Sequence, residues 1–87
     1  MAIIILNHDV KDFATWKPYY DADSGRRAGA GFKEVAVGTD AGNPNKVYII
    51  WEGNPAALED MLKDEELKEL MGKAGVISPP EFTVVNT

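Results

Sequence analysis

The chain has 87 residues, no cysteine, one histidine and a formal net charge of −5 at pH 7. This length predicts a single domain over residues 1–87, and the composition excludes disulfides and disfavours a metal site built from protein side chains, so we expect no metal and no cofactor. An acidic chain with one basic pair, Arg26 and Arg27, does not fit a nucleic-acid-binding protein.

The first apolar run is AIIIL, residues 2–6. It is too short for a membrane span or a secretory signal, and no basic segment precedes it. We therefore expect a cytoplasmic protein with no membrane partner. The β-branched residues predict a strand buried on both faces. The polar stretch NHDVKD, residues 7–12, predicts a turn.

The segment DFATWKPYYD, residues 12–21, predicts the start of a helix that contains Pro18. If Asp12 caps the helix, Pro18 falls in the second turn and removes a hydrogen bond. If Thr15 caps it, Pro18 falls in the first turn, where the amide needs no partner. We therefore predict a tight turn at residues 12–15 and a helix to about Ala28, which the stretch GAG ends.

The middle of the chain predicts a β-hairpin. Residues 32–40, FKEVAVGTD, and residues 46–52, KVYIIWE, have strand-like alternation. Between them lies AGNPN, residues 41–45, whose Gly, Asn and Pro favour a turn.

The last part predicts a second helix and a final strand. Asn54 suits the N-cap and Pro55 the first helical position. The apolar stripe changes phase near Lys63 and Asp64, which predicts a bend there. Gly72 and Gly75 are expected to end the helix, and EFTVVN, residues 81–86, is expected to form the last strand.

The order β-α-β-β-α-β predicts an α+β, ferredoxin-like domain: a four-stranded antiparallel sheet with two helices on one face. Both faces of the predicted strands are apolar. One set of side chains includes Ile4, Ile49 and Trp51, and the other includes Ile5 and Ile50. Two helices can cover only one face, so we expect a homodimer in which two sheets pack face to face. The sequence does not decide which face meets the partner.

Several side chains could form a site. His8 is the only histidine, and with a pKa near 6.5 it could act as a general base; alternatively it is a solvated turn residue. The rings of Trp16, Tyr20 and Trp51 could form a wall for a flat ligand, and core packing is the alternative. Arg27, next to Arg26, could bind a carboxylate or phosphate, or could simply stabilise a helix C-terminus.

Two segments carry a resemblance to a known family. YIIWEGNPAALEDMLKDEELKELM, residues 48–71, resembles the third strand and second helix of antibiotic biosynthesis monooxygenase-like proteins, which belong to the dimeric α+β barrel superfamily. NHDVKDFATWKPYYDADSGRRAGAGFK, residues 7–33, is similar to small proteins of that superfamily without an assigned role, some of them cyclase-like. The resemblance implies a dimeric barrel that can hold a small, often aromatic, molecule. It does not imply histidine-dependent chemistry on the second helix, where Met61 occupies the family's histidine position.

We therefore expect a small-molecule-binding protein of the cofactor-independent monooxygenase or cyclase kind, acting on an aromatic or polyketide-like substrate. In this hypothesis His8 is the base, while Trp16, Tyr20, Trp51 and Arg27 contact the ligand. The alternative is a non-catalytic ligand-binding or structural module, because no second catalytic group is fixed by spacing.

Overall fold

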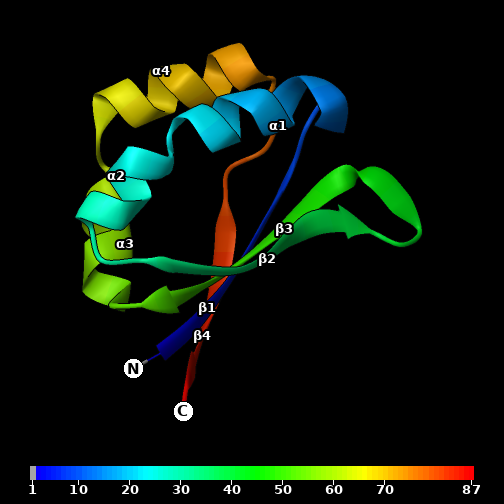
Figure 1. The fold of residues 1–87 in the computed structure, drawn as a ribbon. Coiled ribbons are helices and arrows are strands. Elements are labelled where there is room, and N and C mark those ends of the chain that lie inside the picture. Colours follow the sequence, from blue (N-terminus) through cyan, green and yellow to red (C-terminus); the bar gives the residue numbers. More distant parts are fainter. Residues whose placement is uncertain (1) are drawn as a thin grey trace.

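A computed structural model describes residues 2–87 (Figure 1). The elements in chain order are β1 (Ala2–Asp9), α1 (Phe13–Ala22), α2 (Ser24–Gly29), β2 (Lys33–Asp40), β3 (Asn43–Gly53), α3 (Pro55–Leu62), α4 (Glu65–Ala74) and β4 (Glu81–Asn86). The strands form one antiparallel sheet in the order β2-β3-β1-β4. This confirms the predicted ferredoxin-like α+β fold, with each predicted helix divided into two segments. Within residues 2–87, no helix is long and apolar enough to cross a membrane.

Strand β1 is longer than predicted. The residues Asn7, His8 and Asp9 continue the pairing with β3, so the predicted turn at residues 7–12 is wrong for its first half. The alternation of β1 also continues, because His8 is buried while its two neighbours are only partly buried. The strand therefore carries His8 inward, beneath the helices.

Helix α1 begins one turn earlier than predicted. Asp12 is the N-cap, with an extended backbone (φ −157°, ψ 122°), so the predicted cap at Thr15 is wrong. The Asp12 carboxylate accepts both the backbone N–H of Thr15 at 3.1 Å and its hydroxyl at 2.7 Å. Pro18 consequently lies in the second turn and cannot donate to the carbonyl of Ala14. Both Ala14 and Pro18 are exposed, and this leaves the carbonyl accessible to water.

This position of Pro18 makes a prediction. We expect Pro18→Ala to raise the free energy of unfolding by about 1–3 kcal/mol, because alanine restores the missing N–H and removes the ring from the helix interior. As a comparison, Asp12→Ala should lower it by about 1 kcal/mol. Urea unfolding measures both. A Pro18→Ala variant no more stable than wild type would support the later helix start at Thr15.

The remaining helix boundaries follow capping chemistry. The predicted bend at Lys63 and Asp64 is confirmed, since α3 ends at Leu62 and the Asp64 carboxylate accepts the N–H of Glu66 at 2.9 Å. Asn54 caps α3, as predicted. Gly75, at φ 87°, ends α4, whereas Gly72 remains inside the helix. The break between α1 and α2 at Asp23 was not predicted.

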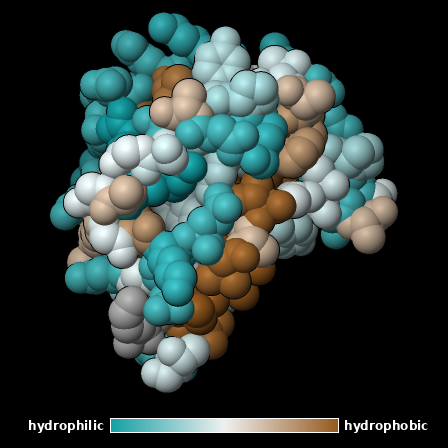
Figure 2. Space-filling model, viewed as in Figure 1, coloured by the Kyte–Doolittle hydropathy of each residue, from teal (hydrophilic) through white to brown (hydrophobic). Residues whose placement is uncertain are grey.

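The helices cover the sheet face formed by alternate residues of β1 and β3. The inner residues Ile4, Leu6, Val47, Ile49 and Trp51 are buried against α1 and α3. The outer face carries the other alternate residues. Ile3, Ile5, Tyr48 and Ile50 are partly buried, and Val85 on β4 is exposed. In the view of Figure 1, hydrophobic side chains also gather at the surface over the region of β1 and β4 (Figure 2).

A β-bulge in β2 changes which of its residues face the helices. The register shifts between Glu34 and Ala36, so Glu34 lies opposite Trp51 and Val37 lies opposite Ile49. Val37 therefore packs against the core, while Val35 in the bulge is 56% exposed. Strict alternation predicts both valines on one face, and this prediction is wrong because the extra residue in the bulge resets the alternation.

Candidate functional site

A cavity of about 80 Å³ lies between the sheet and the helices and is partly open to solvent. Its floor comes from β1 and β3, with His8, Leu6, Ile49 and Trp51. One wall comes from α1 and α2, and the other comes from α3 and α4. The wall from α3 and α4 is almost entirely apolar and includes Leu58, Met61, Leu67, Leu70 and Met71. The structure thus places all five site residues predicted from the sequence, His8, Trp16, Tyr20, Arg27 and Trp51, around one cavity.

His8 is the polar residue of the cavity floor. It is 5% exposed, and its ring meets the Trp16 ring edge to face at a centroid distance of 5.5 Å. Its buried Nδ1 has no hydrogen-bond partner in residues 2–87. Burial lowers the pKa of His8 below 6.5, although the neighbouring Asp9 carboxylate acts in the opposite direction. The interpretation of His8 as a solvated turn residue is wrong, and at neutral pH the imidazole is uncharged.

Trp16 and Tyr20 form the aromatic wall on α1. They are four residues apart, and their rings stack at a centroid distance of 4.9 Å and an interplanar angle of 28°. Both are buried. The two rings belong to the hydrophobic core and line the cavity at the same time, and their contact with a ligand stays a prediction.

The hydroxyl of Tyr20 is fixed by two hydrogen bonds. It donates to the Glu34 carboxylate at 2.8 Å and accepts from the indole N–H of Trp51 at 3.0 Å. Burial is the main cause that raises the pKa of Tyr20 to about 12. The phenol therefore stays protonated at neutral pH and holds the wall in place. Glu34 lies opposite Trp51 on the inner sheet face, and it was missed from the sequence because a charged residue in a strand does not by itself indicate a hydrogen bond to a buried ring.

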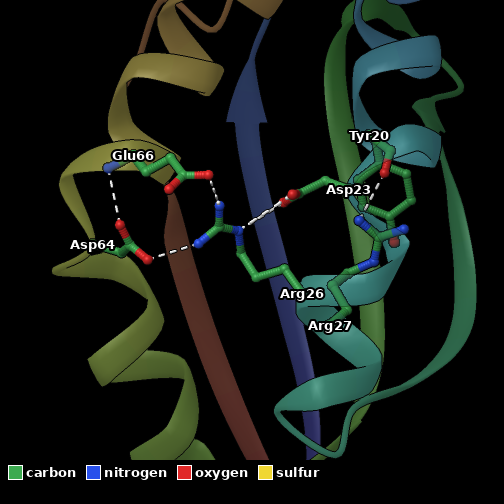
Figure 3. A network of polar contacts seen from close by, with 6 residues as sticks. All are labelled: Tyr20, Asp23, Arg26, Arg27, Asp64 and Glu66. Carbon is green, nitrogen blue, oxygen red and sulfur yellow. Dashed lines mark hydrogen bonds and ion pairs between the residues drawn. The ribbon is translucent and has the colours of Figure 1, made fainter.

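The two adjacent arginines point in different directions (Figure 3). The Arg27 guanidinium lies over the face of the Tyr20 ring, 3.7 Å from its centroid, and donates to the Tyr20 carbonyl at 2.7 Å. Arg26 instead pairs with carboxylates at the start of α4. The pair therefore does not form a joint clamp, and ligand binding by Arg27 alone stays a prediction.

The opposite wall contains the residues that sequence reasoning did not assign to a site. Leu67, Leu70 and Met71 belong to the apolar stripe of the second predicted helix, and such a stripe indicates burial but not a cavity. Met61, at the position where the resembling family has a histidine, lines the cavity and is 9% exposed. No group of three or more potential metal ligands occurs in the described part of the chain.

Comparison with known proteins identifies the fold. No family model and no curated protein matches the chain. A solved structure from Bordetella bronchiseptica, assigned only provisionally as an antibiotic biosynthesis monooxygenase, matches with a TM-score of 0.76 and 13% identity, covering 99% of this chain and 95% of that one. A structure named antibiotic biosynthesis monooxygenase matches with a TM-score of 0.65 and 18% identity, and the match covers 100% of this chain and 98% of that one. An uncharacterised NIPSNAP domain protein from Burkholderia xenovorans matches with a TM-score of 0.67 and 12% identity, and the match covers 100% of this chain and 94% of that one. The chain thus has the fold of antibiotic biosynthesis monooxygenase-like proteins.

Proposed function

We propose that this chain binds a small aromatic molecule in the cavity and acts on it without a cofactor, as a monooxygenase- or cyclase-like enzyme. The observation that carries the proposal is the buried, uncharged His8, whose Nδ1 has no partner and whose ring lies against an aromatic wall. A buried polar atom without a partner costs free energy, and a ligand that hydrogen-bonds to it removes that cost.

In the proposed reaction His8 accepts a proton from a phenol or an activated C–H bond, which leaves an electron-rich anion. With dioxygen as co-reactant, a CH₂ group becomes a carbonyl: one oxygen atom stays on the carbon, and the other leaves as water with the two hydrogens. In the cyclase reaction, the carbanion adds to a carbonyl carbon of the same molecule, and the proton returns to the new alkoxide. The apolar walls exclude water from the anion.

The cavity volume restricts the substrate. An engineered protein cavity of about 150 Å³ holds benzene, so a cavity of about 80 Å³ suits no more than one ring in its present shape. We therefore propose a single-ring phenol as the first substrate class to test. A larger, polyketide-like molecule would require α3 and α4 to move away from α1.

The proposed assembly is a homodimer that covers the outer sheet face. Isoleucines at positions 3, 5 and 50, together with Tyr48, leave an apolar surface on the side opposite the helices. Surfaces of this kind mark association sites, and packing two such sheets together buries both. This arrangement gives the dimeric α+β barrel.

A non-catalytic binding module is the second candidate, and one observation favours it. His8 has no acid–base partner in the cavity wall, because the Tyr20 hydroxyl is committed to Glu34 and the Asp23 carboxylate is paired with Arg26. A base without an orienting partner is a weaker catalytic arrangement than a dyad.

The test compares 4-ethylphenol with ethylbenzene, measured by calorimetry on wild type and His8→Phe. Phenylalanine keeps a ring against Trp16 but removes both nitrogens, so the melting temperature should not fall. We expect wild type to prefer the phenol by about tenfold, the contribution of one hydrogen bond, and the variant to lose this preference.

Oxygen consumption separates the two candidates. Wild type that consumes oxygen with a bound phenol, and His8→Phe that does not, would support the enzyme. The acid limb of this activity should lie below pH 6.5, because the pKa of His8 is lowered and the base must be unprotonated. Binding of 4-ethylphenol without oxygen uptake would contradict the monooxygenase and favour the binding module. Equal binding by wild type and His8→Phe would contradict the site.

A further inference from the structure

Arg26 connects the two helical walls of the cavity (Figure 3). It lies on α2 and pairs with Asp23, just after α1, at 3.1 Å. The same guanidinium reaches across to Asp64 at 2.7 Å and Glu66 at 3.2 Å, at the start of α4. Among residues 2–87, the hydrogen bonds that join α1–α2 to α3–α4 directly all come from this one side chain.

The other end of α4 is attached in a different way. The carbonyl of Gly75 accepts the N–H of Lys11 at 2.9 Å, and the N–H of Ile77 donates to the carbonyl of Asp9 at 2.9 Å. Val76 also forms a β-bridge with Val10, and this fixes the segment to the end of β1. The C-terminal end of α4 is therefore tied to the end of β1 by backbone hydrogen bonds. Its N-terminal end is tied to α3, where the N–H of Asp64 donates to the carbonyl of Met61 at 3.1 Å, and it is tied to α1–α2 through the ion pairs of Arg26.

A groove of about 330 Å³ lies outside the cavity at the Arg26 end. Arg26, Glu66, Glu69 and Lys73 line it, and it shares Tyr19, Asp23 and Leu70 with the cavity. The groove and the cavity therefore adjoin between α1 and α4. A separation of these two helices at the Arg26 end would join the two spaces.

We propose that the Arg26 ion pairs are a latch: α4 pivots near Gly75, and release of Arg26 opens the groove into the cavity as the access route for a small aromatic ligand. This inference rests on the proposed function, because it concerns the same cavity. At about 80 Å³ the cavity is below the usual range for ligand sites, and joining it to the groove would give a ring more room to enter and leave.

The chemistry of the latch suits reversible opening. The Arg26 side chain is 21% exposed, and its partners Asp64 and Glu66 are 42% and 82% exposed. Ion pairs at this exposure are weak and are screened by salt. Without the guanidinium, the three carboxylates at positions 23, 64 and 66 repel one another. Removal of the Arg26 charge should therefore favour the open form.

The first test measures how readily acrylamide, a small neutral quencher, reaches the indoles of Trp16 and Trp51, which both line the cavity. We expect Arg26→Gln to raise the quenching constant about threefold or more, by loss of several weak ion pairs. The control, Lys68→Gln, removes an ion pair within α4 and should leave quenching unchanged.

Added salt should change acrylamide quenching in opposite directions in wild type and in Arg26→Gln. Between about 0.01 M and 1 M salt the Debye length falls from about 30 Å to about 3 Å. Quenching should rise in wild type, where salt weakens the latch, and should fall in Arg26→Gln, where salt relieves repulsion between the carboxylates. A parallel response of both proteins would overturn the proposal.

Hydrogen exchange separates opening from general destabilisation. In Arg26→Gln the amide of Lys68, which closes the first turn of α4, should exchange faster, while the amides of Lys11 and Ile77 keep their protection. A uniform increase in the exchange rates of all three amides would contradict a pivot near Gly75.

If 4-ethylphenol binds wild type and Arg26→Gln at the same rate, the latch is wrong and the proposed function stands. If quenching behaves as expected but no phenol binds, the proposed function is wrong, and only the control of cavity opening by Arg26 is supported.

Discussion

A lysine at Ile50 is expected to convert the proposed dimer into a folded monomer. Ile50 lies in the middle of the outer sheet face, opposite Ile5 on β1 and Ala36 on β2. In a monomer this face is open to water, so a lysine there extends its ammonium group into solvent. In the dimer each copy would bury a charge without a partner, at a cost of several kcal/mol. The dissociation constant should rise by at least about 10³-fold.

Sedimentation equilibrium measures this change, and circular dichroism checks that the variant remains folded. Ile77→Lys is the matched control, because Ile77 is 57% exposed and lies in the connection between α4 and β4, outside the sheet. The control should remain dimeric. A wild-type protein that is monomeric at micromolar concentration would contradict the barrel.

Trp16→Ala should remove a large part of the stability of the domain. Trp16 is 4% exposed and contacts three other rings, those of His8, Phe13 and Tyr20, at centroid distances of 5.5, 5.7 and 4.9 Å. Truncation of such a residue costs about 3–5 kcal/mol, out of the 5–15 kcal/mol that is typical of a whole domain. Urea unfolding at fixed protein concentration measures the loss, since dimer dissociation would also contribute.

Trp16→Phe is the comparison, because it keeps a ring between His8 and Tyr20 and should cost less than half as much. Both variants should weaken 4-ethylphenol binding, in contrast to His8→Phe, which should affect binding without a loss of stability. A stability loss below about 1 kcal/mol for Trp16→Ala would show that this ring packs loosely and does not form a fixed wall.

The architecture was predictable because its signals are local. Apolar alternation in β1 and β3, the cap at Asn54 and the phase change near Lys63 each depend on neighbours in the sequence, and the structure confirms them. The start of α1 was not predictable in the same way. Two capping schemes were possible, and the decision depended on the double hydrogen bond from Thr15 to Asp12, which outweighs the loss at Pro18.

The residues that line the cavity were predictable as a set but not in their arrangement. His8, Trp16 and Tyr20 lie together as expected. The predicted environment of His8 was wrong, because the polar residues around it indicated a turn where β1 in fact continues. The contact between Tyr20 and Glu34 joins residues 14 positions apart, and the contacts of Arg26 with Asp64 and Glu66 join residues 38 and 40 positions apart. Such separations carry no periodic signal in a single sequence.

The two edges of the sheet differ in their resistance to aggregation. On β2, at one edge, register shifts interrupt the strand at Glu34/Ala36 and Thr39/Asp40, and such irregularities hinder the addition of a foreign strand. On β4, at the other edge, the sequence EFTVVN has no irregularity in its pairing and exposes Phe82 and Val85. Partly unfolded or monomeric chains would therefore associate through β4, and this edge is the first place to put a charge when the protein must be kept soluble at high concentration.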